Sequence, residues 1–183
     1  EIDYLFNNFT INHFFILDDS FLSNESRKEE FVQEFKRRIS KNSELKDICL
    51  YAMARPELVS ETTVDFFKKI NIGWVQLGLQ TINPDLQKYI GRKSPIDRFQ
   101  EISQWFHAND IKLHVDIIIG LPDDTLSYFK KTLEYALSLK PFSIQVKQFF
   151  LNKDTMFYDR QKDFEIEIAG EEDFAAPFVS SAR

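Results

Sequence analysis

Polar side chains that can hold a ligand stand inside the most apolar stretches of this sequence. The run KLHVDIII (112–119) carries His114 and Asp116 two residues apart. Side chains alternate across a β-strand, so residues two apart share a face. The same spacing places Gln76, Gly78 and Gln80 on one face of 74–80, and Gln145 and Lys147 on one face of 143–150. These carboxylate, amide and ammonium groups predict a polar surface that binds a ligand through hydrogen bonds and ion pairs.

Further charged residues come directly after two other apolar runs. Arg55 follows 48–53, and Asp18 and Asp19 follow 13–17. The carboxyl ends of parallel strands meet at one edge of a sheet, and α/β proteins bind their ligands at that edge. We therefore expect a polar ligand site there. The alternatives are a sheet with one solvated face, and Asp18 or Asp19 acting only as a helix N-cap.

The runs that carry these residues alternate with helical patterns. Strands are predicted at 13–17, 48–53, 74–80, 112–119 and 143–150. Between them, apolar residues recur at helical spacing, as in the helix predicted over 124–139, with Leu126, Phe129, Leu133 and Leu137 as its apolar stripe. Alternating strands and helices favour parallel pairing. The predicted fold class is α/β, a partial (β/α) barrel with a curved parallel sheet of about five strands and helices on its outer face.

The amino-acid composition indicates which classes of protein and partner fit this chain. The chain has 183 residues, is 43% hydrophobic and contains 19 Phe, which indicates a folded domain with a substantial core. Residues 1–150 hold the strand–helix pattern, whereas 151–183 lose it and are predicted to be a tail or a partial extra element. A net charge of −6 without a long basic run argues against a nucleic acid partner.

Other observations bound the location and the type of ligand. No apolar stretch is long enough for a membrane helix, so no membrane partner is expected. Cys49 is the only cysteine, which excludes an internal disulfide and favours a reducing cytoplasm. His13, His107 and His114 lack metal-ligand spacing, so no metal site is predicted from them, and each is expected to be a structural histidine with its hydrogen bonds satisfied. We expect a small-molecule ligand.

Four motifs in this order resemble the radical S-adenosylmethionine superfamily. They are FFILDDSF (14–21), Arg-Pro (55–56), GLQTINPDLQKYIGR (78–92) and HVDIIIGLPDDT (114–125). The match is most similar to the subgroup whose barrel follows a cobalamin-binding domain, and it extends from the start of the chain to residue 150. The family turn similar to GLPGET is GLPDDT here. The resemblance implies a catalytic barrel for reductive cleavage of S-adenosylmethionine and radical chemistry on an unknown substrate.

The resemblance also implies a [4Fe–4S] cluster, held by three cysteines of a CxxxCxxC loop after the first strand. This sequence has one cysteine, and 13–17 matches the family's second strand by order. We expect the first strand and the cluster loop upstream of Glu1. S-adenosylmethionine, the cluster and, in the resembled subgroup, cobalamin are then cofactors of the longer parent, and the isolated chain is expected to bind none of them and to be inactive.

In the resembled family, the positions that match Gln80, Arg92 and Asp116 contact the cofactor. The guanidinium groups of Arg55 and Arg92 suit the cofactor carboxylate, and Asp116 suits either its ribose hydroxyls or a position near its cationic group. An irregular strand end leaves backbone groups free for adenine. The predicted cofactor-binding residues are Gln80, Arg92, Asp116, Arg55, Asp18, Asp19 and Ile118.

Two interpretations from other classes stay open. One is a non-catalytic α/β domain whose acidic surface binds a protein partner. The other is a different barrel enzyme that uses Asp116 and His114 as an acid/base pair. In the partial barrel that lacks its first strand, the strand at 13–17 leaves an unpaired apolar edge. Such edges promote pairing between chains, so we expect the isolated chain to self-associate there.

Overall fold

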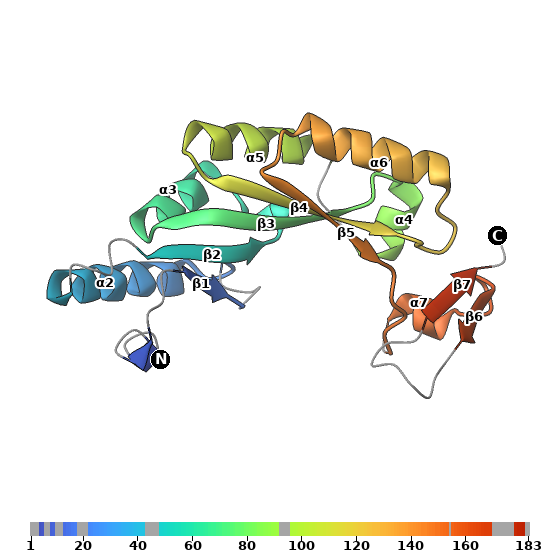
Figure 1. Ribbon diagram of the computed structural model, residues 1–183, viewed down its shortest axis with the longest axis horizontal. Coiled ribbons are helices and arrows are strands. Elements are labelled where there is room, and N and C mark those ends of the chain that lie inside the picture. The colour runs from blue at the N-terminus through green and yellow to red at the C-terminus, as the bar shows by residue number, and fades with distance from the viewer. Residues whose placement is uncertain are drawn as a thin grey trace.

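Five parallel strands form one curled sheet in the order β1-β2-β3-β4-β5 (Figure 1). The computed structural model describes residues 4–5, 8–9, 13–17, 22–42, 48–91, 96–153, 155–169 and 178–181. The strands are β1 (His13–Ile16), β2 (Cys49–Ala54), β3 (Ile72–Gln80), β4 (Lys112–Ile119) and β5 (Ser143–Gln148). Strand order follows chain order, which confirms the predicted half-barrel and places β3 beside β4.

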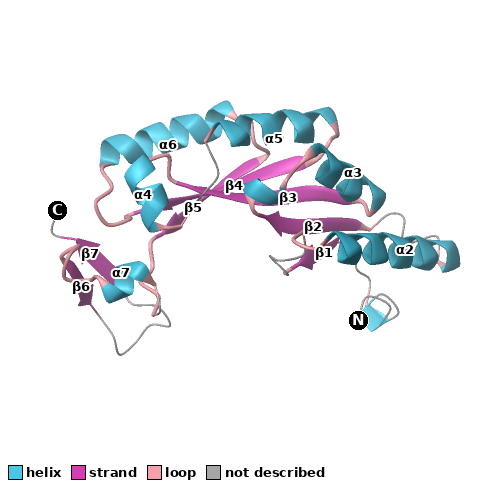
Figure 2. Cartoon of the chain, turned by 180° about the vertical axis from the view of Figure 1, so that it is seen from behind, coloured by secondary structure: helices cyan, strands magenta, loops and turns pink. Residues whose placement is uncertain are grey.

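Four helices cover one face of this sheet (Figure 2). They are α2 (Glu25–Lys41), α3 (Glu61–Lys69), α5 (Asp97–Ala108) and α6 (Leu126–Ser138). Buried side chains from these helices and from alternate strand positions form one apolar core between the two layers. Because the helices shield this face from water, the strand residues that point toward them are apolar: Val, Leu, Ile and Ala, with Phe14 on β1. Within the described residues, no helix is both long and apolar enough to cross a membrane.

Side-chain caps begin the helices where the strand-to-helix loops end. Asn24, Ser60 and Thr125 each accept a hydrogen bond from a backbone N–H in the first turn of α2, α3 and α6. The short helix α4 (Pro84–Tyr89) begins the same way at Asn83. A cap satisfies a backbone donor that has no partner within the helix, so these residues set where each helix starts.

The apolar face of α6 differs from the predicted stripe. Leu126 and Leu137 are 67% and 58% exposed, whereas Thr132 and Ala136 are buried. Phe129 and Leu133 pack on the core as expected. Thr132 can be buried because its hydroxyl accepts from the backbone N–H of Ile82 (3.1 Å) and donates to the carbonyl of Tyr128 (2.9 Å). The prediction that both leucines face the core was wrong. Hydrophobicity alone cannot show that the hydroxyl of Thr132 finds hydrogen-bond partners and that this polar residue is therefore buried.

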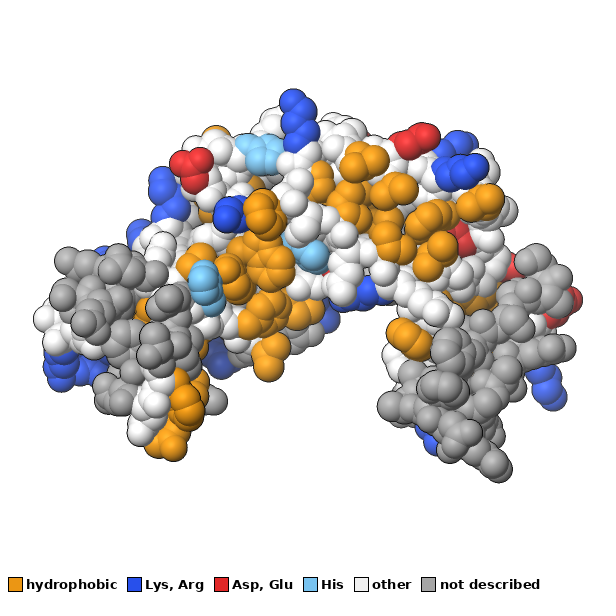
Figure 3. All heavy atoms as spheres, in the orientation of Figure 1, with side chains coloured by type: hydrophobic (Ala, Val, Ile, Leu, Met, Phe, Trp, Pro, Cys, Tyr) orange, Lys and Arg blue, Asp and Glu red, His pale blue; other side chains and the backbone are white. Residues whose placement is uncertain are grey.

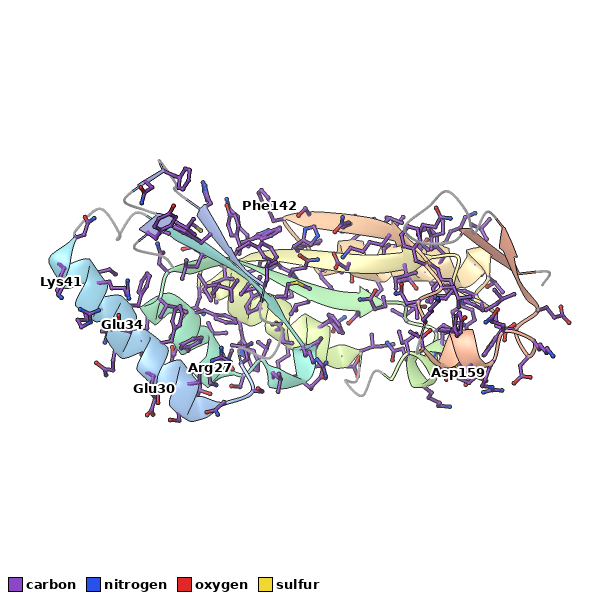
Figure 4. The ribbon with its side chains drawn as sticks, turned by 90° about the horizontal axis from the view of Figure 1, so that it is seen from below. Arg27, Glu30, Glu34, Lys41, Phe142 and Asp159 are labelled. Carbon is purple, nitrogen blue, oxygen red and sulfur yellow. The ribbon has the colours of Figure 1, made fainter. Side chains whose placement is uncertain are left out.

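The other face of the sheet, here called the luminal face, carries no helical layer among the described residues (Figure 4). A row of rings crosses it from β1 to β4. Ring centroids are 5.4 Å apart for His13–Tyr51, 4.9 Å for Tyr51–Trp74 and 5.0 Å for Trp74–His114. Hydrophobic side chains lie next to histidines across the middle of the molecule in Figure 3. This aromatic row lies toward the amino ends of the strands.

The chain after β5 forms a small second cluster beside the carboxyl ends of the strands. Helix α7 (Met156–Asp159) and an antiparallel pair, β6 (Ile166–Ala169) and β7 (Phe178–Ser181), follow one another here. Phe157 and Phe164 pack with Leu86 and Leu121, which belong to α4 and to the loop after β4. The described part of 151–183 therefore includes ordered elements. The domain boundary at residue 150 stays a prediction.

Candidate functional site

Asp116 is the centre of a polar layer on the luminal face. Its carboxylate is buried, with the residue 3% exposed. Oδ2 accepts from Gln76 Nε2 (2.5 Å) and from Lys147 Nζ (2.7 Å), and Oδ1 accepts from His114 Nε2 (3.1 Å). These partners come from β3, β5 and β4. Three donors offset the cost of burying the charge, which an isolated carboxylate in an apolar interior could not overcome.

The carboxylate keeps capacity for one more hydrogen bond. An ionised carboxyl group accepts at about four lone-pair positions, and three donors occupy Asp116 in the structure. Two of these donors share Oδ2, so the spare capacity is at Oδ1. A ligand hydroxyl or N–H group is the complementary partner for such an oxygen.

A bulge at the end of β3 directs Gln80 toward the same place. Gly78 pairs with Asp116, but Gln80 pairs with Ile117, so the register shifts by one residue between them. Gln80 has a left-handed backbone, with φ at 64°. A β-bulge bends the strand and re-aims a side chain, and a residue other than glycine at positive φ is uncommon. The bulge, and not simple alternation, sets the direction of the Gln80 amide.

The Gln80 amide oxygen is buried without a hydrogen-bond partner among the described residues. Leaving a buried acceptor unpaired costs about 1–3 kcal/mol, so such atoms are rare unless a ligand or water satisfies them. An N–H or hydroxyl donor on a ligand would remove this cost. The amide oxygen of Gln80 therefore needs a hydrogen-bond donor from a ligand or water.

A polar cavity of about 150 Å³ joins these groups at the carboxyl edge of the sheet. It is lined by Met53, Ala54, Arg55, Gln76, Gly78, Gln80 and Asp116. Arg55 is exposed and directly follows β2, so its guanidinium can approach a ligand from the rim. The cavity therefore combines a cation, an anion and an unpaired acceptor. That set suits a zwitterionic ligand with hydroxyl groups.

A second cavity, about 750 Å³ in volume, lies between β5, α4 and α7. Its walls are largely apolar, with Ile118, Leu121, Phe149 and Phe157 among them. Lys147 also lines it and binds Asp116, which lines the polar cavity, so this ion pair lies between the two cavities. The volume lies within the range of cavities that enclose small molecules. A larger groove of about 1120 Å³ lies among the charged residues of α2 and α3, on the helical side of the sheet.

The structure brings together three of the predicted site residues. Asp116, Gln80 and Arg55 line the polar cavity, and Ile118 lines the adjoining apolar one. Arg92, Asp18 and Asp19 lie outside the described residues.

Burial raises the pKa of Tyr51, which lies in the aromatic row on the same face.

Two residues of the polar layer were missing from the predicted site. Gln76 and Lys147 bind the Asp116 carboxylate directly. Alternation along the strands already placed both residues on polar faces. Only the register between neighbouring strands shows that they lie next to Asp116. His114 was expected to be a satisfied structural histidine, and both of its ring nitrogens do have partners, Ser143 Oγ (2.5 Å) and Asp116 Oδ1 (3.1 Å).

The described geometry offers little support for an acid/base pair of Asp116 and His114. His114 is 9% exposed, and it is absent from the lining of both cavities beside Asp116. A general acid or base must reach the reacting group. Asp116 faces the polar cavity, whereas His114 contacts the ligand space only through Asp116.

The residues fit S-adenosylmethionine and do not fit an iron–sulfur cluster. The cofactor presents a carboxylate, an ammonium group and ribose hydroxyls, which complement Arg55, Asp116 and the unpaired Gln80 oxygen. A [4Fe–4S] cluster needs several thiolates. The single cysteine, Cys49, is partly buried on β2. Among the described residues, no group of three or more His, Cys, Asp or Glu is placed to hold a metal ion.

A curled parallel half-barrel with a polar cavity at the carboxyl ends of its strands defines a ligand-binding α/β barrel protein. A family model for the radical SAM superfamily matches residues 1–136. That match covers most of the chain, and the chain therefore belongs to the radical SAM superfamily.

The chain is similar to several known proteins. The chain is 22% identical over 147 residues to the zebrafish (Danio rerio) protein "Radical S-adenosyl methionine domain-containing protein 1, mitochondrial", with 79% of this chain and 33% of that protein covered. It shares the fold of the radical S-adenosylmethionine methyltransferase TsrM from Kitasatospora setae, with a TM-score of 0.71, 17% identity, and 82% of this chain and 28% of that one covered.

A third similar protein is Elp3 from the archaeon Methanocaldococcus infernus. The TM-score is 0.70 at 15% identity, over 88% of this chain and 43% of that chain. At these identities the structural matches show the fold alone. The chain spans about a third of the length of the zebrafish relative and less than half of either structure.

Proposed function

We propose that this chain forms the cofactor-binding wall of a radical SAM enzyme that cleaves S-adenosylmethionine reductively and uses the resulting radical on an unidentified substrate. The superfamily implies S-adenosylmethionine and a [4Fe–4S] cluster, which together supply the radical when bound. The residues of this chain would bind and orient the cofactor. The thiolates for the cluster would come from a segment upstream of Glu1, because one cysteine cannot hold it.

Each polar group has a proposed partner on the cofactor. Asp116 would accept from the ribose hydroxyls, and Gln80 would accept through its unpaired oxygen. Arg55 would bind the carboxylate, together with Arg92. The apolar cavity at Ile118 and Leu121 would hold the adenine, with the backbone after β4 hydrogen-bonding its edge. Asp18 and Asp19 are further candidate contacts.

Other features of the parent protein are also proposals. The solved structure of TsrM contains cobalamin, and this motif set resembles the cobalamin subgroup, so we propose a cobalamin-binding domain ahead of this barrel. We propose a cytoplasmic location because a protein with this cluster and a free thiol needs a reducing compartment. The expected partner is a small molecule.

The unpaired Gln80 oxygen carries this proposal, and substituting it gives a direct test. Gln80→Ala in the full-length protein should weaken S-adenosylmethionine binding about three- to tenfold, the range of one hydrogen bond. The free energy of unfolding should stay within about 1 kcal/mol of wild type, since the lost oxygen has no described partner. Equilibrium dialysis and urea unfolding measure the two quantities.

Gln104→Ala is the matched control, because Gln104 is an exposed glutamine on the outer helix α5. It should change neither quantity. Unchanged affinity in Gln80→Ala would contradict the assignment of the polar cavity. Absence of S-adenosylmethionine binding by the wild-type protein would contradict the proposed function itself and favour the interaction-domain interpretation.

A further inference from the structure

A chain of three hydrogen-bonded side chains runs behind the polar cavity. Ser143 Oγ lies 2.5 Å from His114 Nδ1, and His114 Nε2 lies 3.1 Å from Asp116 Oδ1. Ser143 is the first residue of β5, directly opposite His114 of β4 in the register. The ring of Trp74, with its centroid 5.0 Å away, packs on the imidazole. The imidazole is thus held on three sides.

The chemistry of the three groups sets the direction of the hydrogen bonds. A carboxylate only accepts, so His114 must donate to Asp116 from Nε2. In a neutral imidazole, Nδ1 is then the acceptor, and Ser143 donates its hydroxyl proton to it. Asp116 therefore fixes the tautomer of His114, and Ser143 satisfies the other ring nitrogen and holds the ring in place.

We propose that His114, set by Ser143, is a positioning residue that fixes the Asp116 carboxylate for the ribose hydroxyls of the cofactor. This inference rests on the proposed cofactor site. The terminal torsion of an aspartate is broad, so one hydrogen-bonded oxygen does not fix the plane of the group. Gln76 and Lys147 both hold Oδ2, and among the described residues His114 is the donor to Oδ1.

The same geometry argues against a hydrolytic serine. Neither Ser143 nor His114 lines the polar cavity, so a substrate there meets Asp116 first. A nucleophile must reach the substrate, whereas a residue that orients a binding group acts from behind it. In this serine–histidine–aspartate chain, the residue that meets the ligand is therefore the aspartate and not the serine hydroxyl.

The test compares ribose recognition in the wild type and in five variants of the full-length protein. The probes are S-adenosylhomocysteine and its 2′-deoxy and 3′-deoxy forms, with dissociation constants measured by isothermal titration calorimetry. In the wild type, loss of a hydroxyl that Asp116 recognises should weaken binding about tenfold, the scale of a hydrogen bond to a charged group. His114→Ala should reduce that discrimination to about twofold or less, because the carboxylate is free to turn.

His114→Gln should restore most of the discrimination, because its amide donates to Oδ1 and accepts from Ser143. Ser143→Ala should lower the discrimination partially, since it removes the hydrogen bond that holds the orientation of the His114 ring. His107→Ala is the matched control, because His107 makes a comparable hydrogen bond, 3.0 Å to the carbonyl of Lys140, on the outer helix α5. It should behave as wild type.

The outcomes separate the two proposals. If the wild type does not bind S-adenosylhomocysteine, the proposed function fails. If it binds and Asp116→Asn loses ribose discrimination while His114→Ala keeps it, the cofactor site stands and the positioning role is overturned. If His114→Ala does not fold, full discrimination in Ser143→Ala together with loss of discrimination in the folded His114→Gln overturns the role. Retained discrimination in His114→Gln and a partial loss in Ser143→Ala support it.

Discussion

Asp116 offers a sharp prediction about stability, because two substitutions there should differ in a way that the hydrogen-bond network determines. Asn keeps the shape of Asp and one carbonyl oxygen. That oxygen can accept from Gln76 and Lys147, as Oδ2 does now. The Asn amide then faces His114 Nε2. Two donors would oppose each other unless His114 changes its tautomer.

That change of tautomer is available. Nε2 would become the acceptor for the Asn amide, and Nδ1–H would donate to Ser143 Oγ, 2.5 Å away. Asp116→Asn therefore loses the ionic part of its hydrogen bonds and keeps their number. The difference between charged and neutral hydrogen bonds predicts a loss of about 1–2 kcal/mol in the free energy of unfolding.

Asp116→Ala removes the acceptors altogether. Gln76 and His114 are each 9% exposed, so their polar groups would remain buried without the partner. Each unpaired group costs about 1–3 kcal/mol. Lys147 adds little, because its side chain is 42% exposed and can turn into water. The expected loss is about 2–6 kcal/mol, the sum of the costs for these two unpaired groups.

Urea unfolding monitored by circular dichroism measures both losses, provided that the m-value is unchanged. Long-range ¹H–¹⁵N spectra of the three histidines report the tautomer of His114 directly. In Asp116→Asn, the protonated nitrogen should move from Nε2 to Nδ1. Equal destabilisation by Asn and Ala, with no change of tautomer, would refute the described network.

Two further predictions concern parts of the molecule away from the cavity. Glu34 lies on α2, where it is labelled in Figure 4. Arg37 and Arg38 donate hydrogen bonds to its carboxylate and lower the pKa of that carboxyl to about 2 from 4.5. Since the folded-state pKa is lowered, this stabilisation is present above the unfolded pKa of 4.5 and is lost as pH falls to about 2. Glu34→Gln should therefore lower the free energy of unfolding near neutrality, leave it unchanged near pH 2, and flatten its pH dependence between 4.5 and 2, as measured by urea unfolding at several pH values. Leu17, directly after the edge strand β1, is 81% exposed. We therefore expect the isolated chain to self-associate, as measured by sedimentation velocity, and Leu17→Lys to reduce this association; a monomer at all concentrations would contradict the prediction.

The local pattern of the sequence was sufficient for the elements and their order. Alternating apolar and helical runs predicted the five strands and the helices between them, and all five strands lie in the expected order. These features depend on residues close in sequence, whose periodicity of two or near 3.6 is legible without a structure. The motifs that resemble the radical SAM superfamily belong to the same local information, and the family match confirms them.

Face assignment along a strand was also predictable, but the partners on that face were not. Gln76, His114 and Lys147 were placed on polar faces by alternation alone. Their bonds to Asp116 join residues 40, 2 and 31 positions apart, and the two longer ones depend on the register between strands. The register follows from how the whole core packs, and a shift of one residue would reverse each side chain.

The sequence by itself determined a parallel α/β half-barrel with polar residues at one edge, because hydrophobic periodicity is a local property of the chain. Only the tertiary structure decided which of those residues meet. The bulge that aims Gln80, the hydrogen-bond chain from Ser143 to Asp116 and the exposure of Leu137 on α6 each arise from packing between distant segments. Distant segments constrain one another through shape and hydrogen bonding, and no short window of sequence contains that constraint.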